Sequence, residues 1–486
     1  MRAWLITILL LLLAVPHLRW WQDYEVARRG LLAILCGLAC LVPGVLPRKV
    51  PRSVWAINLL ALWFLARSFG VANPGYALET ASHYLALAVL VIIGTGISPG
   101  VVLAAAIPTG LVVALITLAQ AVGWLLPLPG VHEVTSTLGN LNTASEVLTV
   151  CGAAAACLIA TGRAEASESK GMLRGLAFAT LLLCAAAIII NGSRSGMLAL
   201  PIACLVCLLG TSRLLVIGAL LAGVSAGWAI DANTGKPSTT PADQPSLAVS
   251  EESTPSTAAV RLALWRGGLA MVGERPWLGH GAGQFSTQYP RFRTREELEL
   301  SSFHRRFLSA PATAHNDYLQ ILIEGGIPAL LLFVLAVGLL LRRAPVRYWG
   351  PLLAFAVLAG VRAPIGNAPA VALVFLFAGS LLGQYPLPGA ATFSLAPQRQ
   401  MIKGLVLGGL MLWFGATQLL SQIAGASMLE KRALEVDPDG QLASVEAALL
   451  YRPYDHNFRQ LRAQAALRSG SDWLETARSD IEQLRR

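Results

Sequence analysis

The sequence has few charged residues, and it has no cysteine outside its apolar runs. Only 13% of its 486 residues are Asp, Glu, Lys or Arg, whereas 55% are hydrophobic, so an ordinary soluble domain is excluded. All seven cysteines lie in apolar segments, and we therefore expect neither a disulfide framework nor thiol chemistry. The Cys and His spacings that are typical of zinc sites are missing as well.

What the sequence does contain is a series of apolar runs, many near the roughly 20 residues that a helix needs to cross a bilayer. We predict an all-α polytopic membrane protein with about 12–13 transmembrane helices. The first run lacks the small-x-small cleavage site of a signal peptide, so we favour a retained helix. The expected spans are 3–18, 30–46, 53–69, 82–98, 101–126, 143–162, 172–190, 196–211, 213–230, 315–341, 347–363, 369–385 and 403–424.

Positive charge is concentrated in alternate connections between these spans. If the N-terminus lies in the cytoplasm, most loop Lys and Arg residues face inward, as the positive-inside rule requires. The net charge of +10 then partly reflects membrane insertion and needs no nucleic-acid partner. The residues placed inside are Arg48, Lys49, Arg52, Arg163, Lys170, Arg174, Arg213, Arg342, Arg343, Arg347, Arg399 and Lys403.

The spans divide the chain into four parts. We expect N-terminal transmembrane helices over 1–230, an extracytoplasmic loop over 231–314, C-terminal transmembrane helices over 315–424 and a soluble tail over 425–486. Within the loop, 231–259 is rich in Pro, Ser and Thr and is expected to be a flexible linker. Residues 260–314 begin as an amphipathic helix and are expected to form the active-site loop. The tail is similar to a short tetratricopeptide-like (TPR-like) helical repeat on the outer side.

Two polar stations lie on the outward side of the first half of the chain. In T-S-T-L-G-N-L-N, Asn140 and Asn142 precede a helix, where amides either cap the helix or bind sugar hydroxyls. In N-G-S-R-S-G, Arg194 has no acid within a helical turn and could simply reach toward lipid headgroups. However, the small residues around it leave a planar guanidinium free for bidentate contacts with phosphate oxygens.

A third station occupies the large loop. Arg261 and Arg266 precede the turn G-H-G-A-G, and both arginines are candidates for binding phosphate at the same surface as Arg194. The turn follows a helix rather than a strand, so a dinucleotide-binding function is not indicated. Its glycines could form a tight turn and nothing more.

The fourth station, H-N-D, precedes an apolar run. His315 could be a capping or interfacial histidine. It could also be a general base, because Asn316 and Asp317 could orient its ring and the nearby Arg305 and Arg306 would lower its pKa and keep it neutral. Asp317 and Glu324 could support the site from behind, and a divalent ion held by them is a minor alternative.

Taken together, the motifs at these four stations resemble those of a known protein family. The order G-N-x-N, S-R-S-G, R-x-x-x-W…P-x-x-G-x-G-x-G-x-F and H-N-x-x-L…G-G-x-P resembles the O-antigen ligase/polymerase superfamily. This superfamily includes O-antigen ligases, Wzy-type polysaccharide polymerases and bacterial O-oligosaccharyltransferases. By position in the motifs, His315 corresponds to the family's essential histidine, and Arg194 and Arg261 correspond to its arginines. Asn140 and Asn316 match positions with structural or substrate-orienting roles.

The resemblance implies a GT-C-type glycosyltransferase of the bacterial inner membrane that serves lipopolysaccharide or polysaccharide biosynthesis. The enzyme would move a glycan from undecaprenyl pyrophosphate to an acceptor hydroxyl at the periplasmic face. The residues fit this chemistry, because a pyrophosphate leaving group needs cations more than an acid, and a neutral His315 can deprotonate the acceptor. We therefore expect inversion at the anomeric carbon, with neither a metal nor another cofactor.

Alternatives remain open at this point. A transporter or flippase of lipid-linked or anionic glycans is a rival, although coupled transporters place ionisable residues near the bilayer midplane and these spans are almost free of charge there. The acceptor could be lipid A-core, a growing glycan or protein Ser and Thr. The soluble tail, a plausible docking surface, slightly favours a polymerase or a protein-glycosylating enzyme over a minimal ligase.

Overall fold

The computed structural model describes most of the chain. The described residues are 2–14, 24–42, 45–47, 49–124, 134–161, 168–207, 213–233, 257–301, 311–386, 392–394, 397–433, 438–469, 475–476 and 478–480. Most of the expected linker over 231–259 therefore lies outside the described residues, as do Arg305 and Arg306.

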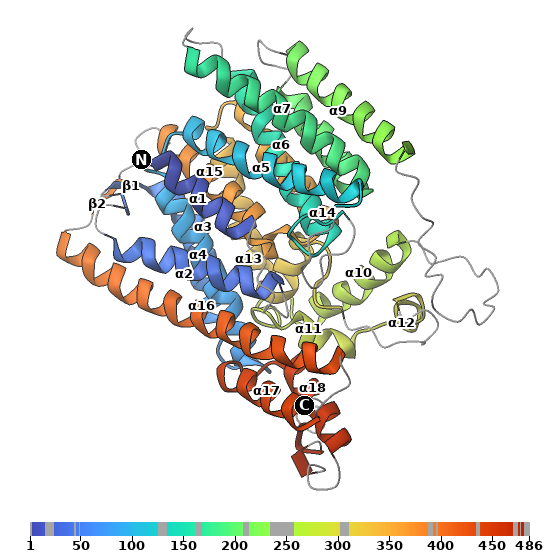
Figure 1. Cartoon of the computed structure of the whole chain (residues 1–486). Coiled ribbons are helices and arrows are strands. Elements are labelled where there is room, and N and C mark those ends of the chain that lie inside the picture. The colour runs from blue at the N-terminus through green and yellow to red at the C-terminus, as the bar shows by residue number, and fades with distance from the viewer. Residues whose placement is uncertain are drawn as a thin grey trace.

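The described chain is built almost entirely of helices (Figure 1). Those of the bundle are α1 (Arg2–Ala14), α2 (Tyr24–Leu41), α3 (Trp55–Ala66), α4 (Pro74–Gly94), α5 (Pro99–Ala121), α6 (Leu141–Thr161), α7 (Glu168–Asn191), α8 (Arg194–Cys207), α9 (Arg213–Asn233), α13 (Asp317–Leu341), α14 (Gly350–Val361), α15 (Ala368–Gln384) and α16 (Pro397–Ala433). The large loop contains α10 (Thr257–Glu274), α11 (Phe285–Gln288) and α12 (Arg295–Ser301), and the tail contains α17 (Pro438–Tyr451) and α18 (His456–Ser469). Short 3-10 turns are η1 (Arg52–Val54), η2 (Tyr289–Arg291), η3 (Val346–Tyr348) and η4 (Pro364–Gly366).

Length and composition confirm the predicted fold class. Among the described residues, seven helical segments are long and apolar enough to cross a membrane, namely α4, α5, α6, Gly171–Asn191 of α7, Arg213–Ala232 of α9, α13 and Gly404–Gly425 of α16. Shorter apolar segments are Leu5–Ala14, Arg52–Ala66, α8, α14 and α15. The remaining expected span, 30–46, falls mainly on α2, which also carries Glu25, Arg28 and Arg29. The protein is thus an all-α polytopic membrane protein.

The bundle is organised around α6. Every residue of α6 from Thr143 to Ala160 is buried, because α5, α7, α8 and α14 pack around it. Small residues make this packing possible: its run Gly152–Ala156 has no side chain larger than a methyl group. By contrast, α9 packs mainly on α7 at the periphery, and most of its surface is left for lipid.

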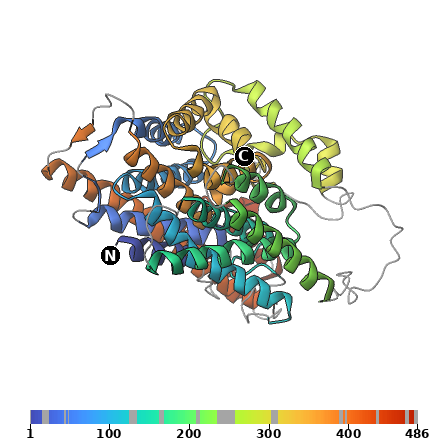
Figure 2. The same ribbon diagram turned by 90° about the horizontal axis from the view of Figure 1, so that it is seen from above.

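A two-stranded antiparallel sheet marks one end of the bundle. Strand β1 (Lys49–Pro51) pairs with β2 (Thr392–Ser394), with Val50 opposite Phe393. Figure 2 shows this sheet on one side of the molecule and the loop helix α10 on the opposite side. The loop helix therefore lies away from the sheet.

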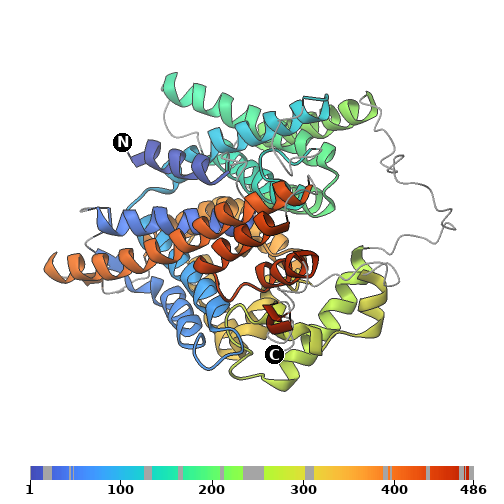
Figure 3. The same ribbon diagram turned by 60° about the horizontal axis from the view of Figure 1, so that its bottom comes forward.

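The tail joins the bundle at the same end as the loop. Helix α16 packs along α2 and continues past 425, the expected start of the tail, to Ala433, and α17 packs against it (Figure 3). Arg452 follows α17 and is buried against the start of α4, where it pairs with Glu79 at 2.7 Å and with Asp455 at 2.5 Å. Asn73 also donates to the carbonyl of Tyr454 at 3.0 Å. The tail is therefore held by a buried polar contact with the first turns of α4.

Candidate functional site

His315 lies immediately before α13, in an unusual backbone conformation. Its φ is +50°, a backbone conformation that residues other than glycine rarely adopt. Such a conformation costs free energy, and it persists only when the surrounding structure holds it. The residue before it, Ala314, is held by two hydrogen bonds. The Ala314 carbonyl accepts a hydrogen bond from Trp265 Nε1 of α10 at 2.9 Å, and the Ala314 N–H donates to Gln320 Oε1 at 2.8 Å. The protein therefore holds the backbone next to the exposed His315 side chain in place.

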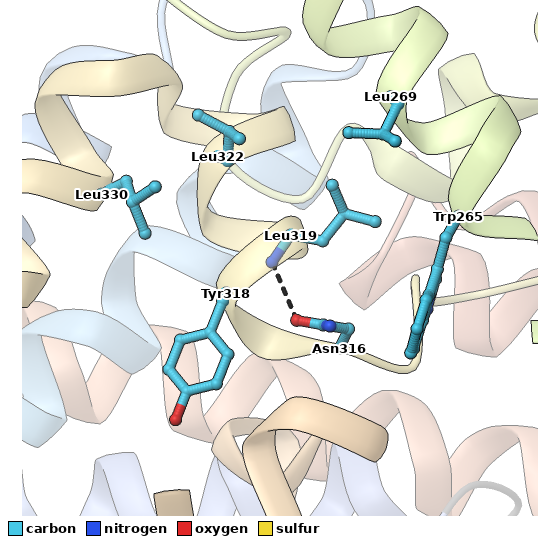
Figure 4. A pocket seen from close by; sticks show the side chains of 7 residues that line it. All are labelled: Trp265, Leu269, Asn316, Tyr318, Leu319, Leu322 and Leu330. Carbon is cyan, nitrogen blue, oxygen red and sulfur yellow. Dashed lines mark hydrogen bonds between the residues drawn. The ribbon is translucent and has the colours of Figure 1, made fainter. Parts of the chain in front are cut away.

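Asn316 and Asp317 secure the start of α13. Asn316 Oδ1 caps the helix by accepting from the Leu319 N–H at 3.0 Å (Figure 4), and its Nδ2 donates to the Gly360 carbonyl at 3.0 Å. Asp317 is buried and accepts from the Ile365 N–H at 3.0 Å. These contacts tie the histidine segment to the connection between α14 and α15. Both side chains are thus occupied with backbone groups, and their predicted contribution to substrate or ring orientation remains a prediction.

The turn G-H-G-A-G packs into a break in α13. At Gly326 the backbone leaves the helix with φ +72°, and Ile327 donates to the Pro276 carbonyl at 2.8 Å instead of to its own helix. The N–H groups of His280 and Gly281 bond to the carbonyls of Ile323 and Glu324, both at 2.9 Å. A Cβ at Gly279 would lie 2.4 Å from the Glu324 oxygen, so only glycine fits there. The turn therefore docks the loop onto the membrane helix.

The Glu324 side chain completes this docking. Its Oε2 accepts from the Gly283 N–H at 2.9 Å, and its Oε1 accepts from Gln320 Nε2 at 2.6 Å. Because Gln320 also holds Ala314, a continuous set of hydrogen bonds runs from the glycine turn to the residue before His315. Glu324 thus supports the site from behind, by contacts with protein groups.

Two arginines lie close enough to His315 to influence its charge state. Partial removal of the ring from water, followed by the positive charges of Arg261 and Arg362, lowers the pKa of His315 to about 4. The sequence predicted this direction, but it assigned the effect to other arginines. Burial likewise lowers the pKa of Arg261. The imidazole is therefore neutral at physiological pH and able to accept a proton.

His280, a second histidine of the loop, is not available to accept a proton from a substrate. His280 is 4% exposed, and its Nε2 is 2.9 Å from the carbonyl oxygen of Met271. Its pKa is lowered mainly by burial. His280 therefore has a packing role within the turn, whereas the His315 ring lies at the surface.

Arg362 connects the histidine to the station around Arg194. Its Nε donates to Ser195 Oγ at 3.1 Å, and Ser195 follows Arg194 in the first turn of α8. Ser195 also contacts Ser193 Oγ at 3.1 Å, which in turn accepts from the Gly196 N–H. The structure thus brings Arg194, Arg261, Arg362 and His315 to one end of the bundle. Among the described residues, no carboxylate pairs with any of these three arginines within 4.0 Å.

Arg266 differs from Arg261, although both are on α10. Its Nη1 lies 2.9 Å from Glu296 Oε2, and both side chains are more than half exposed. Its charge is therefore already compensated, and it is not among the charges that influence His315. The geometry favours Arg261 over Arg266 as the arginine nearest the reacting groups.

Asn140 lies at the start of α6 and caps this helix. Its Oδ1 accepts from the N–H groups of Asn142 at 2.8 Å and Thr143 at 3.4 Å. The preceding segment is held by the buried Arg28, which donates to the carbonyls of Thr137 and Leu138. Asn140 thus has the capping role that the sequence offered as one alternative, and contact with a sugar remains a prediction.

Sequence reasoning missed Arg362 because the expected span 347–363 included it. The helix α14 ends at Val361, and Arg362 has an extended backbone with φ −143° and ψ −168°. The signal was present in R-A-P-I-G, where an arginine and a proline interrupt the apolar pattern at the outward end of a span. Its contact with Ser195, 167 positions earlier, has no local signature.

The comparison with known families gives one match. Residues 179–334 match the family model described as O-antigen ligase. The match begins in α7 and ends in α13, so it includes Arg194, Arg261 and His315, whereas Asn140, Arg362 and the tail lie outside it. Among curated proteins, none matches the chain. Over the region that carries the large loop and the histidine, this match confirms the resemblance to the O-antigen ligase superfamily.

Proposed function

We propose that this protein is a membrane glycosyltransferase that transfers a glycan from undecaprenyl pyrophosphate to an acceptor hydroxyl at the periplasmic face of the bacterial inner membrane. The observation that carries the proposal is the neutral His315 beside uncompensated arginines at one end of the bundle, within the O-antigen ligase match. This combination supplies a base for the acceptor and cations for the leaving group.

The arginines stabilise the leaving group. When the bond between the anomeric carbon and the pyrophosphate oxygen breaks, the electron pair stays on that oxygen, and undecaprenyl pyrophosphate gains negative charge. Preorganised guanidinium groups stabilise this charge and can bind phosphate oxygens in pairs. We assign this role to Arg194 and Arg261. No step requires a metal ion, because the cations are supplied by side chains.

His315 activates the acceptor. The acceptor oxygen forms its bond to the anomeric carbon as its proton moves to the imidazole, and a single displacement of this kind inverts the anomeric centre. A pKa of about 4 makes the ring a weak base in the free enzyme. A bound pyrophosphate would compensate the nearby arginines and raise the pKa of His315. The donor thereby increases the basicity of the group that activates the acceptor.

Two apolar cavities beside the histidine segment support a lipid-linked donor. One, of about 320 Å³, lies between α10 and α13 and is lined by Trp265, Leu269 and Leu330 (Figure 4). The other, of about 250 Å³, lies among α3 and α13–α15, beside Phe333 and Phe355. Tyr318, three residues after His315, lines both. An isoprenoid chain is apolar, and these cavities offer it apolar space that begins at Tyr318, at the start of α13.

Purified protein in detergent, supplied with an undecaprenyl-pyrophosphate-linked glycan, tests the proposal. We expect undecaprenyl pyrophosphate to be released only when an acceptor is added, and the acceptor that works would separate ligase, polymerase and protein-glycosylating activities. His315→Ala should reduce release by about 100-fold or more, the usual contribution of a general base. His456→Ala, which changes a histidine of the tail, is the matched control.

Two results would contradict the proposal. Turnover by His315→Ala close to that of the unmodified protein would remove the base assignment. Protein that binds the lipid-linked glycan but never releases its carrier, with any acceptor, would instead favour a transporter or flippase.

A further inference from the structure

Arg362 is held at the site by its backbone and by one side-chain contact. The chain leaves α14 at this residue, and η4 follows directly with Pro364, so the main chain is fixed on both sides. Its Nε donates to Ser195 Oγ at 3.1 Å, which sets the plane of the guanidinium. The hydrogen bond uses one of the five N–H donors and leaves the four on the Nη atoms for other partners.

The surroundings of Arg362 are unusually positive for a half-buried group. Burial and the charge of Arg261 both lower its pKa, to about 10, while Glu146 of α6 is the carboxylate that opposes this effect. Glu146 itself is buried and accepts from Asn367 Nδ2 at 2.8 Å. Glu146 thus offsets part of the charge of Arg362 without forming a close ion pair with it.

A half-buried Arg362 beside Arg261 is unfavourable unless another group compensates the positive charge. Withdrawing a charge from water costs free energy, and a second like charge nearby raises that cost. A role confined to joining α14 to α8 would need only the bond to Ser195, which a neutral side chain can make. The remaining positive charge and the free Nη donors suit an anion that carries several oxygens.

We propose that Arg362 binds the pyrophosphate group of the lipid carrier together with Arg194 and Arg261, and that Ser195 positions its guanidinium for this contact. This inference rests on the proposed function, and it assigns to that site a residue outside the segment that matches the O-antigen ligase family. Ser195 is a positioning residue, because it acts through Arg362.

Binding of the reaction product tests this assignment without requiring turnover. The affinity of the purified protein in detergent for undecaprenyl pyrophosphate would be measured alongside the donor KM, with inorganic pyrophosphate as a headgroup-only probe. Arg362→Gln should weaken product binding and raise the donor KM by at least tenfold, with an unchanged melting temperature. Arg362→Lys should recover little, because a single ammonium cannot reproduce a planar fork. Ser195→Ala should cause a smaller loss of the same kind.

The control is Arg275→Gln, because Arg275 is exposed and lies near Glu274 at the end of α10. Product affinity of Arg362→Gln within twofold of the unmodified protein would overturn the inference and leave the proposed function intact. Full recovery by Arg362→Lys would also overturn it, since a point charge would then suffice. If Arg362→Gln does not fold, the Lys variant alone decides. Failure of the unmodified protein to bind undecaprenyl pyrophosphate would overturn both proposals.

Discussion

The junction between the tail and α4 and the site around His315 use the same residue type in opposite ways. At the junction, Arg452 is 3% exposed and pairs with Glu79 and Asp455. Burial disfavours its charge, but these two carboxylates more than offset burial and raise the pKa of Arg452 above its ordinary value. At the site, Arg362 is half-buried beside Arg261, and its pKa is lowered.

The difference shows how to distinguish a structural arginine from a ligand-binding one in this chain. A guanidinium whose charge is matched inside the protein contributes to stability, and removing it leaves buried carboxylates without a partner. A guanidinium that the protein does not match adds little to stability and can bind an anion strongly. Changes at the two places should therefore affect different properties.

The largest effect on stability is expected at the junction. Arg452→Ala removes the cation that neutralises the buried carboxylates of Glu79 and Asp455, which should lower the free energy of unfolding by about 3–5 kcal/mol. Heat denaturation in detergent would measure this loss. Arg295→Ala is the control, because Arg295 forms an exposed pair with Glu299 on α12 and its removal should leave the melting temperature close to that of the unmodified protein. Equal melting temperatures for the two variants would contradict a stabilising role for Arg452.

At the site, a substitution should change the activation free energy of catalysis by a comparable amount and leave the free energy of unfolding almost unchanged. Arg261→Ala is expected to reduce turnover by about 100- to 1,000-fold, the usual cost of removing one group that stabilises developing charge, while the melting temperature stays unchanged. Arg266→Ala, five residues farther along the same helix, should have a much smaller effect because Glu296 already compensates that charge. A larger loss of activity for Arg266→Ala than for Arg261→Ala would reverse the assignment.

The smallest effect expected near physiological pH is the change of rate with pH that follows from protonation of His315. In the free enzyme its pKa is about 4, so kcat/KM should stay level as the pH falls and decline only near that value, where the base becomes protonated. The acid limb of kcat should lie at higher pH, because bound pyrophosphate raises the pKa in the complex. Steady-state assays across the acid range would measure both limbs. A kcat limb at lower pH than the kcat/KM limb would rule out this coupling.

Much of the fold was predictable because apolar runs reveal helices that face lipid. The errors fall where polar residues lie inside a helix. The expected span 82–98 begins at Pro74 in the structure, since Asn73 caps α4 and Glu79 and His83 find partners within the protein. A hydropathy pattern assigns such polar residues to a loop. It contains no information on the partners that stabilise them inside the protein, which come from the tail and from the connection before α15.

The site was predictable in part for the same reason. His315, Arg194 and Arg261 stand out because each interrupts or borders an apolar segment at the outward end. Arg362 was hidden inside a predicted span, and the role of G-H-G-A-G depended on its contacts with the break in α13, which the motif G-G-x-P marks without indicating its partner. Both features arise from contacts between segments far apart in the sequence, so periodicity alone could not reveal them.

The break at Gly326 also limits how this enzyme can be recombined with its relatives. The carbonyls that α13 leaves unpaired there are the acceptors for the turn, so the outer loop and the membrane helix share one seam of hydrogen bonds. If a chimera exchanged the loop alone, the N–H groups of the new turn would meet α13 carbonyls whose positions fit the original turn. Residues 257–341 should therefore be exchanged as a single segment, so that the turn and its carbonyl acceptors stay together.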